Sequence, residues 1–505
     1  MIPAPSPVLT PSSYQSPSAF SRKRLTLAFW AVAGGLLIYE SLLVQAGAWT
    51  DNLGACLITL VALIPSYYWC TGKAQGFPIM PLFTLTTIWT YALPLVSNYT
   101  QVNQYSAPER FIASLTVVGF LLISILIWFQ FLKSVSPRPV YRILNPRKGV
   151  NLLLFVLCLR AIFEILLVAS WLPLGGGTFA LIRNSILALS SVAVFVIFLR
   201  LGQNELSKCQ SFLTILFLLI SIVSSTASLF LIPGISLCFL AIIAYTISKK
   251  KIPIFIISIF LVCLMILHYG KSDMRTKYWN NGTATAVFTP WQYPSIFTEW
   301  VGYSLDYLTL KKDKQDINRQ SFIERSSLMQ ILLLAQSNSP ERLPHLNGAT
   351  YAILPELLVP RIFNPTKIRS HEGTYILNVY YGTQTYEQAL NTTIGWGLLA
   401  ESYANFGFLG CGILGLLLGL FYGWLTRLSM AAPILSDRSL FSTLIMTMSF
   451  QTEWTMGVYV ATLFQGSVIL LAFVIIFMKP ERFLPSRGVQ LYGFLPSSPP
   501  PRTRG

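Results

Sequence analysis

The chain has 505 residues, of which 53% are hydrophobic and only 11% are charged, and its mean hydropathy is +0.59. Soluble domains carry about 25% charged residues, so this composition excludes a soluble globule and indicates a polytopic membrane protein. The formal net charge of +17 raises the question of a nucleic-acid partner. We expect none, because most cations fall in tails and short loops that can lie on one side of a membrane.

Residues 1–24 are rich in Pro and Ser and end in the basic run Arg22 to Arg24, directly before the first apolar stretch. This pattern predicts a disordered cytoplasmic tail. The apolar stretch that follows contains Glu40 and continues into further apolar segments. We therefore expect a membrane anchor and not a cleaved signal peptide.

Apolar stretches of roughly 17 to 23 residues, the length that crosses about 30 Å of hydrocarbon, predict an all-α polytopic membrane protein with about 12 transmembrane helices. Two of these spans have weak signals. The block 211–247 is divided only by Pro233-Gly234, and 438–453 is short and ends at Glu453. The predicted spans are 25–46, 52–70, 80–97, 111–133, 150–172, 178–199, 211–229, 231–247, 252–269, 405–426, 438–453 and 457–478.

With these spans, Lys and Arg concentrate in alternate loops, which predicts that both termini are cytoplasmic.

The first external loop contains Asp51 beside Asn52, without the paired acids that a metal-dependent lipid-phosphate-sugar transferase needs. The predicted units are a cytoplasmic tail at 1–24, a bundle of about nine spans at 25–269, a partly helical extracytoplasmic loop at 270–404, three spans at 405–478 and a cytoplasmic tail at 479–505.

Several charged residues fall inside the predicted spans. Arg160 and Glu164 are four residues apart and therefore share one helix face, while Arg183 lies near the external end of its helix. Such charges are costly in lipid and should face the bundle interior or water. One interpretation is a structural pair, either Arg160 with Glu164 or Glu164 with Arg183. Another is that Arg183 helps to bind an anionic lipid headgroup.

The long loop is rich in Trp and Tyr, a composition typical of folded segments. Apolar spacing within 320–336 predicts one short helix, and a second is expected around Ala349 to Leu358, ending near Pro360. Arg361, Lys367 and Arg369 then bring three cations close together in a segment stiffened by prolines. This array suits a phosphate or diphosphate, although a solvated basic face or contact with anionic lipid would give the same pattern.

Glu401 lies at the entry of the next predicted span, between glycines that permit a close approach, with Tyr403 and Asn405 beside it. A carboxylate there is a candidate general base or sugar ligand. It is equally interpreted as a charge that stabilises a helix N-terminus.

Three elements of the stretch Ser339–Gly410 resemble bacterial O-antigen polymerases of the Wzy type, which are related to the O-antigen ligases. They are Pro360-Arg361 with Pro365 and Lys367, then Thr392-Thr393, then the run from Gly397 to Gly407. The remainder of the chain resembles this family in topology only. Asn364-Pro365 stands where family members often have Trp-Pro.

The resemblance implies a glycosyltransferase of the bacterial cytoplasmic membrane that polymerises undecaprenyl-diphosphate-linked repeat units on the external face. It implies lipid-linked oligosaccharides and the bilayer as partners, together with a chain-length regulator and a flippase, and it requires no metal or cofactor. The leaving diphosphate would be neutralised by Arg361, Lys367 and Arg369 with Arg325 and Arg183. Glu401 or His371 would act as the base, and Tyr403 and Asn405 would bind substrate.

Electrostatic stabilisation of the leaving group is commonly the larger contribution, so we expect Arg361→Ala to damage polymerisation more than His371→Ala. Two alternatives remain open at this stage. An O-antigen ligase-like transferase would share the donor and differ in acceptor. A transporter of lipid-linked glycans would carry ionisable groups or broken helices in both halves, whereas the candidate chemistry here concentrates in 270–410.

Overall fold

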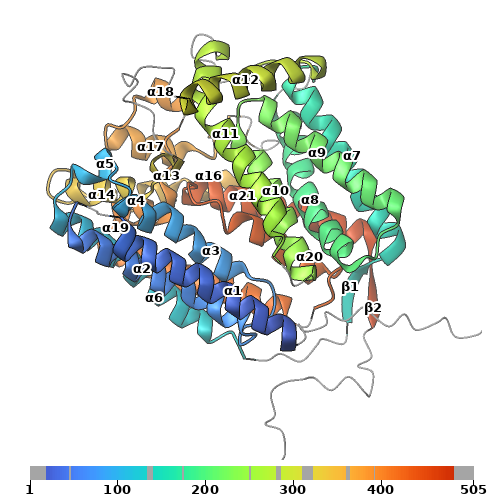
Figure 1. The fold of residues 1–505 in the computed structure, drawn as a ribbon, viewed down its shortest axis with the longest axis horizontal. Helices are drawn as coiled ribbons and strands as arrows, with labels where there is room; N and C mark the ends of the chain where they lie inside the picture. Colours follow the sequence, from blue (N-terminus) through green and yellow to red (C-terminus); the bar gives the residue numbers. More distant parts are fainter. Residues whose placement is uncertain are drawn as a thin grey trace, which may run out of the picture.

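The computed structural model describes residues 19–44, 47–133, 140–172, 176–249, 252–279, 286–309, 322–359, 364, 366–391, 393–430 and 432–482. These parts are almost entirely α-helical, with one two-stranded sheet (Figure 1). Eleven of the described helical segments are long and apolar enough to cross a membrane. A helix satisfies all its internal backbone groups within itself, which is why apolar segments of this length adopt it in lipid. The protein is a multi-pass membrane protein.

The first group of helices lies together at one side of the bundle (Figure 1). Here α2 packs against α3 and α6, and α19 from the C-terminal part packs along α6. The elements are α1 (Ala19–Ile38) with a π-helical turn (Tyr39–Leu43), α2 (Trp49–Cys70), α3 (Ile79–Thr87) with a π-helical turn (Ile88–Ala92), α4 (Leu93–Val96), α5 (Thr100–Asn103) and α6 (Ala107–Phe129).

The second group forms the other side of the bundle, where α7 packs against α9 and α8 against α10 (Figure 1). The predicted division of the block 211–247 is confirmed, because α9 ends at Ala227 and α10 begins at Leu231. The ninth predicted span was too short: its helix continues past residue 269 to Tyr278. The elements are β1 (Val140–Leu144), α7 (Pro146–Val168), α8 (Gly176–Gln203), α9 (Lys208–Ala227), α10 (Leu231–Lys249) and α11 (Ile254–Tyr278).

Short helices fill much of the described chain between α11 and α19. The helix predicted within 320–336 is instead two helices, α13 and α14, whereas the one predicted around Ala349 to Leu358 is present as α15 and α16. The elements are a 3-10 turn (Pro290–Gln292), α12 (Tyr293–Leu308), α13 (Phe322–Arg325), α14 (Met329–Asn338), α15 (Ala349–Ala352), α16 (Leu354–Leu358), α17 (Glu372–Tyr380) and α18 (Tyr386–Asn391).

The C-terminal part contains α19 (Gly397–Ser429), α20 (Asp437–Met448), α21 (Met456–Phe477) and β2 (Met478–Arg482). The expectation of a full-length helix at 438–453 is wrong: at 1.5 Å per residue, α20 is only about 18 Å long. The predicted boundary at residue 405 is also corrected, because α19 begins at Gly397 and contains a kink at Gly407. The segment Ser449–Thr455 that follows α20 is not helical.

Strand β1, which precedes α7, pairs antiparallel with β2, which follows α21, in a register from Val140↔Arg482 to Leu144↔Met478. The backbone N–H of Leu144 also donates to the Leu435 carbonyl at 3.0 Å. Two distant parts of the chain are therefore joined at the end of the bundle where α7 begins (Figure 1).

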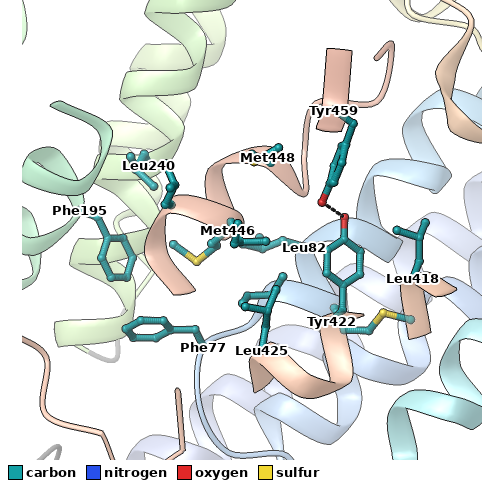
Figure 2. Packing of buried hydrophobic residues seen from close by; sticks show 14 of the residues in the cluster. Phe77, Leu82, Phe195, Leu240, Leu418, Tyr422, Leu425, Met446, Met448 and Tyr459 are labelled. Carbon is teal, nitrogen blue, oxygen red and sulfur yellow. Dashed lines mark hydrogen bonds between the residues drawn. The ribbon is translucent and has the colours of Figure 1, made fainter. Parts of the chain in front are cut away.

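Buried side chains from both groups of helices meet α20 and α21 in the core (Figure 2). The Phe77 and Phe195 rings pack edge to face, with their centroids 5.3 Å apart. The Tyr422 hydroxyl of α19 lies 3.2 Å from the Tyr459 hydroxyl of α21. Each hydroxyl thus gains a polar partner inside the apolar core, as buried tyrosines usually do.

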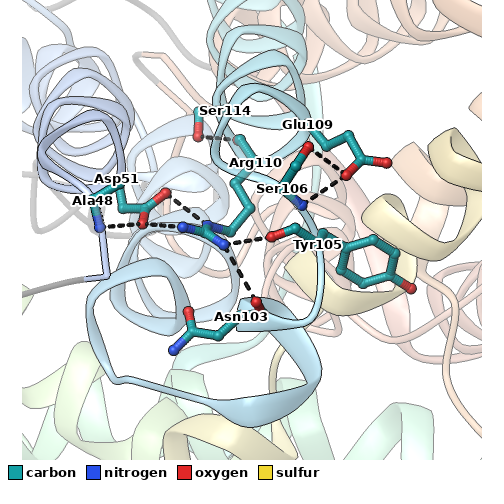
Figure 3. A network of polar contacts seen from close by, with 8 residues as sticks. All are labelled: Ala48, Asp51, Asn103, Tyr105, Ser106, Glu109, Arg110 and Ser114. Carbon is teal, nitrogen blue, oxygen red and sulfur yellow. Dashed lines mark hydrogen bonds and ion pairs between the residues drawn. The ribbon is translucent and has the colours of Figure 1, made fainter.

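Arg110 and Asp51 form a buried ion pair between α6 and α2 (Figure 3). Arg110 Nε lies 2.8 Å from Asp51 Oδ1, and Arg110 Nη2 lies 2.7 Å from Asp51 Oδ2. The Arg110 guanidinium also donates to the Asn103 and Tyr105 carbonyls, and Asp51 Oδ2 accepts from the Ala48 N–H at 3.1 Å. Two residues that the sequence places in external loops therefore fasten two spans together.

Candidate functional site

A cavity of about 820 Å³ lies between the second group of helices and the C-terminal part of the chain. Its lining comes from α7, α8, α9, α10, α20 and α21, from the turn between α9 and α10, from Ala286 and Val287, from the segment Ser449–Thr455 and from the residue that precedes α17. Most lining side chains are apolar, including the aromatic residues Phe163, Phe179, Phe230 and Trp454. The polar lining residues include Arg160, Glu164, Arg183, Asn184, Ser236, His371, Gln451 and Gln465.

Arg160 and Glu164 contribute the most deeply buried charges of this lining. They are the predicted pair on one face of α7, and Arg160 Nη2 lies 2.5 Å from Glu164 Oε1. Arg160 Nη1 also donates to Ser190 Oγ on α8 at 3.3 Å, while Arg160 Nε has no partner among the described residues. Pairing reduces the cost of burying both charges, and Arg160 keeps donor capacity on the cavity wall.

Arg183 and His371 lie together at another part of the wall. Arg183 is on the first turns of α8 and His371 directly precedes α17, and both side chains are accessible within the cavity. Burial and the nearby charge of Arg183 lower the pKa of His371 below its ordinary value of 6.5. His371 is therefore neutral at physiological pH, the state in which an imidazole can accept a proton.

Amide side chains complete the polar lining. Asn184 Nδ2 of α8 donates to Gln465 Oε1 of α21 at 2.6 Å, and Gln451 Nε2 donates to Ser236 Oγ of α10 at 3.3 Å. Amides offer donors and acceptors to a hydroxyl-rich ligand, and the aromatic rings offer apolar faces. The cavity thus suits an anionic group joined to a polar, hydroxyl-bearing part.

The non-helical segment Ser449–Thr455 separates this cavity from a smaller one. Phe450, Gln451 and Trp454 line the large cavity. Ser449, Gln451 and Thr452 line the smaller one, which has a volume of about 30 Å³ and is also bordered by Tyr422 and Tyr459. Irregular backbone within a membrane bundle is tolerated where it lines a cavity, and this segment lines two.

Glu401, Tyr403 and Asn405 are not among the residues that line the large cavity. Glu401 is fully buried, and its Oε2 accepts a hydrogen bond from the Met456 N–H at 2.5 Å. Asn405 Nδ2 donates to Thr350 Oγ1 at 2.8 Å, and Tyr403 donates its hydroxyl to the Ser339 carbonyl at 3.3 Å. These three side chains connect α19 to the short helices and to α21.

The structure does not bring the predicted array of Arg361, Lys367 and Arg369 together at the large cavity. Arg361 lies outside the described residues. Lys367 donates Nζ to the Leu357 carbonyl near the end of α16, and Arg369 is exposed. Neither lines the large cavity, and neither does Arg325 of α13. Six of the seven predicted substrate-binding residues are described by the structure, and among these six only Arg183 lies on the cavity wall, together with the predicted base His371.

The residues that sequence reasoning missed are the amides Asn184, Gln451 and Gln465. Polar amides within apolar spans were the available signal, since such groups are expensive in lipid. Searches of the chain against protein-family models, curated proteins and solved structures give no match.

Proposed function

We propose that the protein polymerises lipid-diphosphate-linked oligosaccharide repeat units at the external face of a bacterial cytoplasmic membrane. The observation that carries this proposal is the 820 Å³ cavity within a membrane bundle, where Arg160 and Arg183 share the wall with His371 and with amide side chains. Arginine recognises phosphate oxygens through its forked donors, and amides recognise sugar hydroxyls. The membrane location supports a substrate that carries a lipid.

The proposed reaction joins two lipid-linked glycans. A hydroxyl at the non-reducing end of the acceptor attacks the anomeric carbon of the donor glycan, and the bond from that carbon to the lipid-diphosphate oxygen breaks. The acceptor proton passes to the neutral His371 imidazole. Arg183, with Arg160 deeper in the cavity, stabilises the negative charge of the leaving lipid diphosphate. His371 is preferred to Glu401 as the base because His371 is accessible from the cavity, whereas Glu401 is sealed.

The test is reconstitution of the purified protein in liposomes that contain lipid-linked repeat units and no other protein. Formation of a glycan ladder on the lipid carrier is the expected result. Arg183→Gln and His371→Gln should both reduce the ladder to a small fraction of the wild-type amount. Arg427→Gln is the matched control, since Arg427 is exposed at the end of α19 away from the cavity, and it should retain the wild-type ladder. A ladder of wild-type length from Arg183→Gln would exclude the cavity as the site of polymerisation.

A second candidate is transport of lipid-linked glycans, which is favoured by one observation. α20 is a short helix, and the non-helical segment after it borders the large cavity. Transporters often build their substrate sites from such discontinuous helices. A lipid-linked repeat unit that lacks the acceptor hydroxyl separates the two functions. A transporter would still move it across the vesicle membrane, whereas a polymerase would leave it in place and form no ladder.

A further inference from the structure

A group of charged residues that is separate from the cavity lining comes from α11, α13 and the segment Ser449–Thr455. Lys271 and Arg275 are one turn apart on α11 and therefore share a face. The charge of Arg325 on α13 repels both of them, and the charge of Glu453 attracts Lys271 and Arg325. Each of the three cations thus interacts electrostatically with at least one other charge of the group, and we call these four residues the Lys271 cluster.

The charges of the Lys271 cluster are not balanced. Lys271 is only 8% exposed, yet its side chain makes no hydrogen bond or ion pair with any residue that the structure describes. Arg325 is exposed and also makes no hydrogen bond or ion pair with a described residue, and within the described ranges Glu453 forms no ion pair with either cation. An ammonium group on a largely buried side chain is costly in a membrane protein when it has no ion pair or hydrogen bond. An anion bound at the cluster would remove that cost.

Arg275 is held in a fixed position for such a ligand. Its Nε and Nη2 donate to the Leu229 carbonyl in the turn between α9 and α10, at 3.1 and 2.8 Å. Its guanidinium also lies 4.1 Å from the Trp279 ring centroid and 5.2 Å from that of Phe230. These contacts use only some of the five N–H groups of Arg275. The remaining N–H groups can bind an anion with little further loss of side-chain entropy, because the side chain is already held in place.

The Lys271 cluster borders the large cavity. Phe230 lines the cavity, and its ring contacts the Arg275 guanidinium. Gln451 and Trp454 also line the cavity, and they stand on either side of Glu453 in the sequence. Arg160 and Arg183 therefore provide cations inside the cavity, while the Lys271 cluster provides cations at its border.

We propose that Lys271, Arg275 and Arg325 form a second anion site, which binds the diphosphate headgroup of a second lipid-linked glycan. This inference rests on the proposed function, because polymerisation requires two lipid diphosphates at once. The donor diphosphate leaves during the reaction and binds at Arg160 and Arg183. The acceptor diphosphate stays intact and binds at the Lys271 cluster, so that the two glycans meet in the cavity.

The test measures binding of a radiolabelled short-chain prenyl diphosphate without sugars to the full chain in nanodiscs of neutral lipid. Wild type should bind two molecules per chain. Arg183→Gln and the double variant Lys271→Met, Arg325→Gln should each lose one site or weaken it by about tenfold or more, since hydrogen bonds to charged groups are strong. A single molecule bound to wild type, or two bound with unchanged affinity to the double variant, would overturn the proposal.

Lys277→Gln is the matched control for loss of a positive charge on the same helix. Lys277 is half exposed and pairs with Glu299 at 2.6 Å, so this variant should still bind two molecules. Thermal unfolding without ligand provides a further readout. Lys271→Met should unfold at the wild-type temperature or above, because an unpartnered buried charge is removed, while the rise caused by prenyl diphosphate should shrink. A lower unfolding temperature without ligand would identify Lys271 as a structural cation and refute the site.

A phosphate-bearing headgroup can also come from an ordinary anionic phospholipid. The experiment is therefore repeated in nanodiscs that contain anionic phospholipid in excess over the prenyl diphosphate. If prenyl diphosphate still binds at two sites, the proposal is supported. If excess phospholipid displaces prenyl diphosphate from the Lys271 cluster alone, the cluster binds ordinary phospholipid and the proposal is overturned. If wild type binds two prenyl diphosphates but forms no glycan ladder, polymerisation is refuted and the second anion site is supported. If it forms a ladder but binds only one prenyl diphosphate, polymerisation is supported and the second anion site is refuted.

Discussion

The carboxylate of Glu401 on α19 accepts a hydrogen bond from the backbone N–H of Met456, the first residue of α21. The first N–H groups of a helix have no partner within that helix, and a side-chain oxygen from another helix can supply the missing acceptor. Glu401 therefore caps a neighbouring helix from within the bundle. The contact fixes α21 at the point where the irregular segment Ser449–Thr455 ends.

We expect Glu401→Ala to lower the free energy of unfolding by about 1–3 kcal/mol, because it leaves the buried Met456 N–H without an acceptor. Glu401→Gln keeps an acceptor oxygen and should unfold close to the wild-type temperature in detergent. The glutamine variant should also retain polymerisation in liposomes. A variant that unfolds like wild type but forms no ladder would instead establish Glu401 as the base that the family resemblance implies.

The kink in α19 depends on Gly407. Its φ of +62° is unfavourable for other residues, and an added Cβ would lie 3.1 Å from His345 Nε2. We expect Gly407→Ala to destabilise the protein by roughly 1–3 kcal/mol, measured by thermal unfolding. Gly412→Ala on the same helix is the control, since its Cβ would meet Ile123 at an ordinary 3.7 Å. Equal unfolding temperatures for the two variants would contradict this account of the kink.

The buried pair of Arg110 and Asp51 should be sensitive to loss of one partner. Arg110→Met leaves the Asp51 carboxylate buried without its cation, and we expect a loss of about 3–5 kcal/mol in unfolding free energy. The double variant Arg110→Met, Asp51→Asn should lose less than the sum of the two single variants. Lys277→Met breaks an exposed pair and serves as control, with little expected change. Strict additivity in the double variant would argue against coupling of the two side chains.

The acid side of the pH profile should report on His371. Because burial and Arg183 lower the pKa of His371, kcat/KM for polymerisation should fall as the pH drops through a value below 6.5. In the same window the unfolded chain binds more protons than the native protein, so stability also falls toward acid pH. Arg183→Lys keeps the charge and should preserve this profile.

Arg183→Gln removes one cause of the lowered pKa, and its residual activity should therefore fall at a higher pH than that of wild type. An unchanged acid limb in Arg183→Gln would show that the titrating base is not His371.

The sequence predicted the features that depend on local patterns. Apolar length identified the eleven long helices, and a spacing of four residues predicted the Arg160–Glu164 pair. The length of α11 was misjudged because charged residues follow its apolar part. The helix continues through them, and this continuation places Lys271 in the interior.

Features that depend on distant contacts were not predictable from local pattern. Glu401 and Asn405 have the composition of a binding site, but they are enclosed by residues near 350 and 456, whose position no short motif reveals. The cavity likewise combines α7, α8, α10 and α21 with a residue before α17, so its polar groups are scattered along the sequence from Arg160 to Gln465. A resemblance limited to one stretch could include His371 but not Asn184 or Gln465.

The pairing of β1 with β2 has a mechanical consequence. The ribbon fastens the start of α7 to the end of α21, so these helices cannot separate at that end without breaking the ladder of hydrogen bonds. Arg183 lies in the first turns of α8, at the opposite end of the bundle. Any separation of α7 and α8 from α21 is therefore smallest at the ribbon and can be larger at the end where Arg183 lies, where it would have to break the hydrogen bond between Asn184 and Gln465.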